Sequence, residues 1–479
     1  GSKAIKMIDA FKKSDDSSST IVGAAIALLS TTFGALLSLT GAWIASGALL
    51  SATFIIWALI QSELALWSTI VIFSLIPFGT MPFKFILTPT FLDITIATIY
   101  LVFFTQRLKS NRQPLVSTPA HIPIIIFILL SILSFILGTS NTSINPNLLR
   151  KFVGYILNIS LALIIVDQVH NRLILTRIIK TIIVSGFAAA ILGIALYIAP
   201  PNLSELSLNY LSVFNYPSGD VLRYIEDNPA NPLRAIGTSV DPNIFGGLLA
   251  IVAALLVPQI STKNPIFKQR LTVVLMLIVT ITSLVLTYSR TAMSALLASM
   301  IFVAIIRKRK TLWIIAAMLL LVLFLPLSQQ YVSHFTDAIK GQDLATSMRL
   351  GEYKDAFVLI GRYPTFGVGF GGTPDIDIYL GVSSAYLLLA EQVGLIGFSS
   401  FLIVITTVFV WGIKHRLVSL TNKSLSSQWL GIYGALVATT IVGVFDHYFV
   451  NLDFQSSQTC FWVLIGLSLA ITRISQELK

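Results

Sequence analysis

Long apolar runs without charged residues recur along almost the whole chain, and they constrain its fold more than any other feature. The 479 residues are 55% hydrophobic and only 11% charged, with a mean hydropathy of +0.85. A soluble domain usually carries about 25% charged residues. An apolar run of about 20 residues can cross a bilayer as a helix that satisfies its own backbone hydrogen bonds. Because the two-residue alternation of a membrane barrel is absent, the sequence predicts an all-α polytopic transmembrane bundle.

We expect about 12 to 14 membrane spans, because two of the apolar runs abut closely and one is short. The predicted spans of the first half are Thr20–Leu39, Trp43–Ile60, Leu64–Ile76, Thr90–Thr105, Ile122–Leu137, Phe152–Val166 and Ile178–Ala199. Those of the second half are Asp241–Val257, Leu271–Thr287, Ala292–Ile306, Leu312–Leu327, Ala385–Trp411, Gln428–Val444 and Gln458–Ile471.

The spacing of these spans divides the chain into six parts. We predict a cytoplasmic leader at 1–19, whose first two residues resemble a tag remnant, and transmembrane helices at 20–199, 241–327 and 385–479, the last ending in a short cytoplasmic tail. Two longer loops, 200–240 and 328–384, separate the helical parts. Long ordered loops are usually functional. The second loop contains an amphipathic stretch, Ser347–Ile360, with apolar residues at helical spacing, so we expect a partly helical loop domain.

The placement of Lys and Arg predicts the orientation in the membrane. If the N-terminus is cytoplasmic, most of the 32 basic residues fall on the cytoplasmic side, as the positive-inside rule requires. Both termini are then cytoplasmic and both long loops face outward. The net charge of +11 therefore reflects contact with the bilayer rather than with nucleic acid.

Six basic residues lie in or beside the two outward loops: Arg223, Arg234, Arg290, Arg349, Lys354 and Arg362. We single out the first four, which are arginines. A guanidinium group offers a fixed fork of donors that suits phosphate oxygens, and it stays charged when partly desolvated. Arg290 occupies a turn too short to leave the membrane surface, where an ionisable group suggests function. The alternatives are snorkelling to lipid headgroups or pairing with a carboxylate of the opposite loop.

Acidic and histidine side chains on the same side are candidate general bases. We single out His447, Asp446, Asp375 and Asp377, because a histidine or a carboxylate can accept a proton from a sugar hydroxyl. A residue at the outer end of a span can equally anchor the helix at the interface, and this alternative stays open for His447. The single cysteine, Cys460, excludes an intramolecular disulfide and a cysteine-based metal site.

Several of these segments together resemble the O-antigen ligase/O-antigen polymerase superfamily of bacterial membrane glycosyltransferases. They are Arg234–Asn243 entering a span, Thr287–Ala292 in a hairpin, Arg349–Ala356 running into Pro364–Gly371, and Tyr386–Gly397. The resemblance implies a GT-C-like fold and a transferase that needs neither metal nor other cofactor and acts outside the bacterial inner membrane. Its implied donor is a polyprenyl-diphosphate-linked oligosaccharide, its acceptor a glycan or lipid-glycan hydroxyl. Other envelope polysaccharide-assembly proteins are possible partners. The family arginines at Arg234, Arg290 and Arg349 would hold the diphosphate.

One position departs from the ligase pattern. Ligases carry a His-Asn pair just before the Tyr-Leu segment, and the histidine is their proposed base. Here that pair falls on Ser383 and Ser384, and serine cannot act as an unaided base near neutral pH. The departure favours a repeat-unit polymerase over a ligase.

A multi-span solute transporter or permease is the alternative. Transporters place ionisable groups near the middle of the membrane, often in broken helices of two matching halves. Asp93 and Glu391 are the plainest charged residues inside the predicted spans, and the two halves of the sequence look dissimilar.

Overall fold

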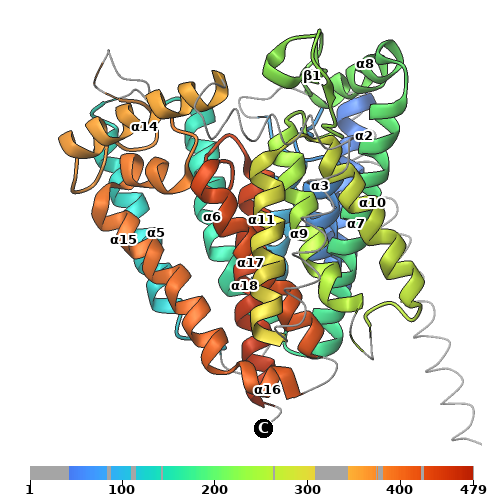
Figure 1. The fold of residues 1–479 in the computed structure, drawn as a ribbon. Coiled ribbons are helices and arrows are strands. Elements are labelled where there is room, and N and C mark those ends of the chain that lie inside the picture. Colours follow the sequence, from blue (N-terminus) through green and yellow to red (C-terminus); the bar gives the residue numbers. More distant parts are fainter. Residues whose placement is uncertain are drawn as a thin grey trace, which may run out of the picture.

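The computed structural model describes residues 42–82, 88–108, 115–141, 144–260, 262, 265–307, 344–373, 375, 381–421 and 425–477. Within these ranges the chain is mostly helical, and the strands form a single two-stranded sheet (Figure 1). The longer helices are α2 (Ala42–Ile60), α3 (Glu63–Leu75), α4 (Phe91–Arg107), α5 (His121–Gly138), α6 (Pro146–Gln168), α7 (Arg172–Ile198), α9 (Pro242–Ile260), α10 (Arg270–Leu286), α11 (Arg290–Arg307), α14 (Leu344–Arg362), α15 (Ala385–Lys414), α17 (Leu425–Phe445) and α18 (Gln455–Glu477). The shorter elements are α8 (Pro201–Asn209), α16 (Arg416–Thr421), the 3-10 turns η1 (Tyr210–Phe214) and η2 (Ile225–Asp227), and the strands β1 (Arg223–Tyr224) and β2 (Leu233–Arg234).

The predicted all-α polytopic bundle is confirmed. Within the described residues, 8 helices are long and apolar enough to cross a membrane, and shorter apolar helices lie at Leu49–Ile60, Glu63–Leu75 and Arg270–Leu286. The predicted spans that fall in these ranges each coincide with a helix, displaced by a few residues at the ends. The predicted spans Thr20–Leu39 and Leu312–Leu327 and the leader at 1–19 lie outside the described residues.

Three helices of the second half form the centre of the bundle. The apolar window of α18 is 100% buried, that of α9 83% and that of α17 72%. By contrast, the window of α5 is only 33% buried, and its isoleucines at 122, 125 and 126 are exposed. In lipid an apolar face needs no protein cover, so this face of α5 is suited to the hydrocarbon region.

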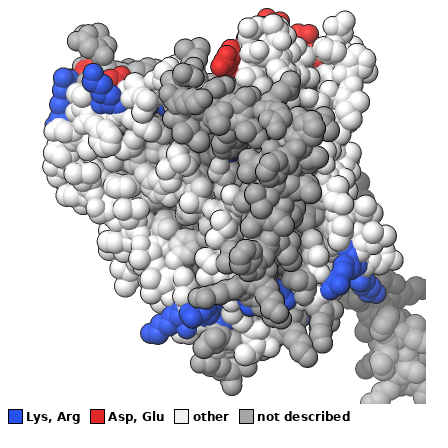
Figure 2. Space-filling model, in the orientation of Figure 1, with Lys and Arg blue, Asp and Glu red and all other residues white. Residues whose placement is uncertain are grey.

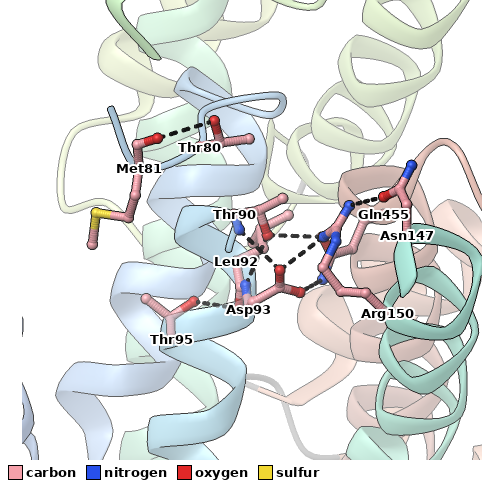
Figure 3. Close-up of polar contacts among 9 residues, drawn as sticks. All are labelled: Thr80, Met81, Thr90, Leu92, Asp93, Thr95, Asn147, Arg150 and Gln455. Atoms are coloured by element: carbon pink, nitrogen blue, oxygen red, sulfur yellow. Dashed lines mark hydrogen bonds and ion pairs between the residues drawn. The ribbon is translucent and has the colours of Figure 1, made fainter. Parts of the chain in front are cut away.

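Asp93 lies at the end of a helix, where it has structural partners. Thr90 and Asp93 form a capping box at the start of α4, in which the Asp93 carboxylate accepts the backbone N–H of Thr90. The same carboxylate accepts Arg150 Nη1 at 2.9 Å and Gln455 Nε2 at 2.7 Å, which joins α4 to α6 and α18 (Figure 3). The sequence analysis treated Asp93 as a charge inside a span. The structure accounts for it instead as a paired carboxylate that fixes three helix ends.

Helix α15 is broken at Gly394, where the φ angle of +67° departs from helical geometry. The glycine-rich segment Pro364–Gly371 passes beside this break. The carbonyl oxygens of Glu391 and Gln392 accept Val368 N–H at 2.9 Å and Gly369 N–H at 3.0 Å, and Leu395 N–H donates to the Pro364 carbonyl at 2.7 Å. The glycine-rich segment therefore supplies hydrogen-bond partners to the backbone at the break, as a buried irregular segment requires.

The two ends of the bundle differ in charge. Figure 2 shows Lys and Arg along the end that carries the C-terminus, and Asp and Glu along the opposite end, where a second basic group lies over α14. At the C-terminal end Arg107 pairs with Asp167, and Arg473 donates to the Val169 carbonyl at 2.8 Å. Both arginines lie in segments that the positive-inside rule predicts to be cytoplasmic.

Candidate active site

The end of the bundle opposite the C-terminus contains a pocket lined by three arginines. Arg234, Arg290 and Arg349 border one open space of about 760 Å³, together with Glu226 and Asp227. The arginines come from β2, from the start of α11 and from α14, which are far apart in the sequence. The fold thus brings together three of the four arginines that the sequence analysis singled out.

Arg234 is held in place by the polar groups around it. Its Nε donates to the Thr287 carbonyl at 2.9 Å, and its Nη2 donates to Asn243 Oδ1 at 2.9 Å. Asp241 Oδ1 accepts the N–H groups of Asn243 and Ile244, so it caps the start of α9 as expected for an Asp-Pro helix entry. Burial lowers the pKa of Arg234 from its ordinary value, although the Asp241 and Asp227 carboxylates oppose this. The guanidinium still stays protonated at neutral pH.

Arg290 begins α11 directly after an unusual turn. Tyr288 adopts a left-handed conformation with a φ angle of +52°, and Thr287 Oγ1 accepts the Ser289 N–H at 3.1 Å. This turn reverses the chain between α10 and α11 within a few residues and directs Arg290 to the pocket.

Left-handed residues other than glycine gather around this pocket. Within the described residues they are Asn215, Glu226, Asp227, Val240 and Tyr288. Glu226, Asp227 and Tyr288 line the pocket, and Val240 directly precedes the capping Asp241. Such conformations cost about 1–3 kcal/mol each, and they cluster at functional sites.

Arg349 reaches the pocket from α14, which the sequence analysis expected at Ser347–Ile360. No hydrogen bond or ion pair joins its guanidinium to another of the described residues. Glu352, one turn further along α14, accepts the Ser383 N–H at 2.8 Å rather than pairing with Arg349. Tyr353 donates its hydroxyl to the Ser383 carbonyl at 3.2 Å. Ser383, at the position of the ligase histidine, is therefore fixed by its backbone to the helix that carries Arg349.

Asp446 and His447 follow the last residue of α17 and lie close to the arginine pocket. Asp446 is only 7% exposed, and its Oδ2 has no hydrogen-bond partner among the described residues. Burial raises the pKa of Asp446 to about 7, helped by the Asp241 carboxylate and opposed by Arg349 and Arg234. Burial also lowers the pKa of His447 from its ordinary value, although Glu352 and Asp241 oppose this. Asp446 Oδ1 lies 3.9 Å from His447 Nδ1.

The other candidates are not brought to this pocket. Arg223 lies opposite Arg234 in the β1–β2 ladder, but its side chain is exposed and does not line the space. Asp375 is held by Arg362, whose Nη1 lies 2.9 Å from its Oδ2. Asp377 lies outside the described residues. Within the described ranges no group of His, Cys, Asp and Glu side chains is arranged to hold a metal ion.

Asn243 is a residue that the sequence analysis did not single out. It lines the pocket and its side chain orients Arg234. A signal was present, because Asn243 ends the motif that begins with Arg234. Only the folded turn shows that the first and last residues of that motif are in contact.

The chain is thus a multi-pass helical bundle, the architecture of a membrane protein, with a pocket lined by three arginines at one end. Residues 271–402 match the sequence model of the O-antigen ligase family, and this match supports membership of the O-antigen ligase/polymerase superfamily. It likewise supports a glycosyltransferase-type enzyme that acts on lipid-linked glycans in a membrane. The matched region contains Arg290, Arg349 and Ser383, whereas Arg234 and Asp446 lie outside it. No curated protein matches the chain.

Proposed function

We propose that this protein transfers glycan from a polyprenyl-diphosphate-linked oligosaccharide to an acceptor hydroxyl on the outer side of the bacterial inner membrane. The observation that carries the proposal is the common pocket of Arg234, Arg290 and Arg349. The family match supports glycan transfer in general, and the pocket supports a diphosphate as the leaving group.

The charge of the pocket favours a diphosphate. Three guanidinium groups face two carboxylates, Glu226 and Asp227, which are both exposed and therefore screened by solvent. Arginine forks bind phosphate oxygens in pairs. As the glycosidic bond to the carrier breaks, negative charge gathers on the diphosphate, and donors fixed in advance stabilise that charge most effectively.

Asp446 is our proposed general base. The acceptor hydroxyl oxygen attacks the anomeric carbon, the bond from that carbon to the diphosphate oxygen breaks, and Asp446 takes the hydroxyl proton. A carboxyl group with a pKa of about 7 is well matched to this transfer at neutral pH. The backbone N–H of His447 donates to Asp446 Oδ1 at 3.0 Å and would orient the carboxylate.

We favour a repeat-unit polymerase over an O-antigen ligase. The ligase pattern places a histidine at position 383, and Ser383 here has its backbone held by Glu352 and Tyr353. The proton-accepting role of the ligase histidine would pass to Asp446, which lies at the end of a different helix. A different base position supports a different acceptor.

The test is transfer by the purified protein in liposomes that contain the lipid-linked oligosaccharide. Arg349→Ala should lower the turnover at least about 100-fold, because it removes a charge-stabilising donor. Lys354→Ala is the matched control, since Lys354 lies on the same helix, is exposed and does not line the pocket. Its turnover should stay within a factor of about two of the wild type. Full turnover by a folded Arg349→Ala protein would refute the diphosphate site.

A further inference from the structure

A second pocket lies at the same end of the bundle, between the start of α6, the segment before α15 and the turn before α18. Its open space is about 730 Å³. We propose that it binds an uncharged stretch of glycan chain and holds the acceptor for the transfer, an inference that rests on the proposed function.

Three asparagines around this pocket have their amide orientation fixed. Asn145 Oδ1 accepts Leu148 N–H at 2.8 Å, Asn147 Oδ1 accepts Arg150 Nη2 at 3.3 Å, and Asn451 Oδ1 accepts Asp453 N–H at 2.9 Å. Each partner is a donor, so the oxygen of each amide is identified and the NH₂ group is the free end. Figure 3 shows that Arg150, which holds Asn147, is itself fixed by Asp93. The pocket therefore offers several preset donors to the lone pairs of sugar hydroxyls.

Gln392 supplies a hydrogen-bond acceptor, in contrast to the donors of the asparagines. Its side chain lines the pocket and is only 6% exposed, and its Oε1 has no hydrogen-bond partner in the described part of the chain. A buried amide oxygen without a donor costs about 1–3 kcal/mol, which a ligand hydroxyl would offset. Gln392 lies just before the break in α15, where its carbonyl is already used by Ser134 Oγ and Gly369 N–H. Its position is therefore fixed by the backbone on both sides.

The second pocket differs from the arginine pocket in its net charge. Its two charged residues, Lys151 and Asp453, form an ion pair with each other, so the lining is neutral. The apolar part of the wall comes from Phe370, Leu388 and Leu452. Amide groups of fixed orientation beside an apolar wall suit an uncharged sugar ring that carries hydroxyl groups. A phosphate would not be favoured, because the lining has no net positive charge.

Backbone hydrogen bonds connect the second pocket to the segment of the proposed base. Asn451 N–H donates to the His447 carbonyl at 3.1 Å, and Ala385 N–H donates to the Asp446 carbonyl at 3.0 Å. Gly381 lines the second pocket two residues before Ser383, which is bound to the helix of Arg349. The second pocket is therefore joined to the segments that carry Asp446 and Arg349, as an acceptor site for the proposed transfer requires.

The test compares two probes that bind without turnover: inorganic pyrophosphate, and the oligosaccharide released by mild acid from the lipid-linked donor. Isothermal titration on the detergent-purified chain should show that Gln392→Met weakens oligosaccharide binding roughly fivefold to tenfold, the value of a lost neutral hydrogen bond. Asn147→Ala should weaken it to a similar degree. Asn202→Ala, an exposed asparagine of α8 at the same end, is the control and should bind as the wild type does.

The arginine pocket and the second pocket should respond independently to substitution. Arg290→Ala should weaken pyrophosphate binding more than about tenfold while it leaves oligosaccharide binding within a factor of about two. Gln392→Met should keep its thermal stability, because it removes an amide oxygen that lacks a partner. Oligosaccharide binding that is absent from the wild type, or unchanged in both Gln392→Met and Asn147→Ala, refutes the acceptor pocket. Absence of pyrophosphate binding refutes the arginine site instead, so the two failures are distinguishable.

Discussion

At the scale of single residues, Asp446 combines burial with proximity to charge in a way that suits the proposed chemistry and lowers folding stability. Its carboxyl group is 7% exposed, and one of its oxygens has no partner within the described residues. In the unfolded chain the same group has its ordinary pKa of 3.8, against about 7 in the folded protein. The folded state therefore holds the proton more tightly. Folding stability falls as the pH rises from about 4 to 7 and levels off above that, because the buried group must ionise.

Asp446→Asn should separate the effect of this carboxyl group on the transfer rate from its effect on folding stability. Transfer by the wild type should rise with pH and reach a plateau above about 7, since the base must be ionised. At pH 8 the variant should lose about 10²- to 10⁴-fold in rate, the loss should shrink as the wild-type base becomes protonated below pH 7, and the melting temperature at pH 8 should equal or exceed that of the wild type. Product formation and thermal unfolding in detergent, measured over a pH series, check both expectations.

His447→Gln is the comparison for that series. Burial lowers the pKa of His447, and the backbone N–H that holds Asp446 is kept in the variant, so the replacement should leave the midpoint of the pH profile unchanged. If this variant abolishes the pH dependence and Asp446→Asn does not, the base is His447.

At the scale of elements, the break in α15 and the glycine-rich segment beside it form one unit. A Cβ added at Gly394 would lie 2.3 Å from the Thr365 carbonyl oxygen, and one at Gly369 would lie 2.6 Å from Gly138 Cα. The backbones approach too closely for any side chain. This unit also positions Gln392, so the shape of the second pocket depends on it.

Gly394→Ala should therefore destabilise the protein by more than about 2 kcal/mol, from the left-handed backbone together with the clash. Gly361→Ala is the matched control, since an added Cβ there meets nothing within 4 Å and Gly361 lies in α14. That change should be neutral, or stabilising by up to about 1 kcal/mol. Thermal unfolding of both variants in the same detergent measures the difference, and equal melting temperatures would contradict the packing described here.

The sequence predicts these elements unequally. The helices follow from local hydropathy, so their positions could be predicted to within a few residues. The break at Gly394 could not, because it depends on hydrogen bonds to Val368 and Gly369, whose contact with α15 is created by the fold. Arginines stand out in an apolar chain, so the basic site could be predicted too. The amides of the second pocket could not, since Asn145 looks like an ordinary helix cap and Gln392 like a residue inside a span.

At the scale of the whole molecule, the separation of the two ends ties the proposed chemistry to one side of the membrane. The arginine pocket and the amide pocket lie at the end opposite the C-terminus, while the pairs of Arg107 with Asp167 and of Arg177 with Glu63 join helix ends at the other. The positive-inside rule assigns the latter end to the cytoplasm. Both proposed sites would then face outward, where the proposed transfer takes place.

Cysteine labelling tests this orientation directly, because the chain has a single cysteine, Cys460, which is 4% exposed. Lys354→Cys on α14 and Lys268→Cys before α10 place an exposed thiol at opposite ends of the bundle. In intact spheroplasts a membrane-impermeant maleimide should label Lys354→Cys at once and Lys268→Cys only after the membrane is permeabilised. The wild type, with its buried thiol, sets the background. The reverse pattern would put both pockets in the cytosol, away from an externally displayed donor, and the transfer proposed for them could not take place there.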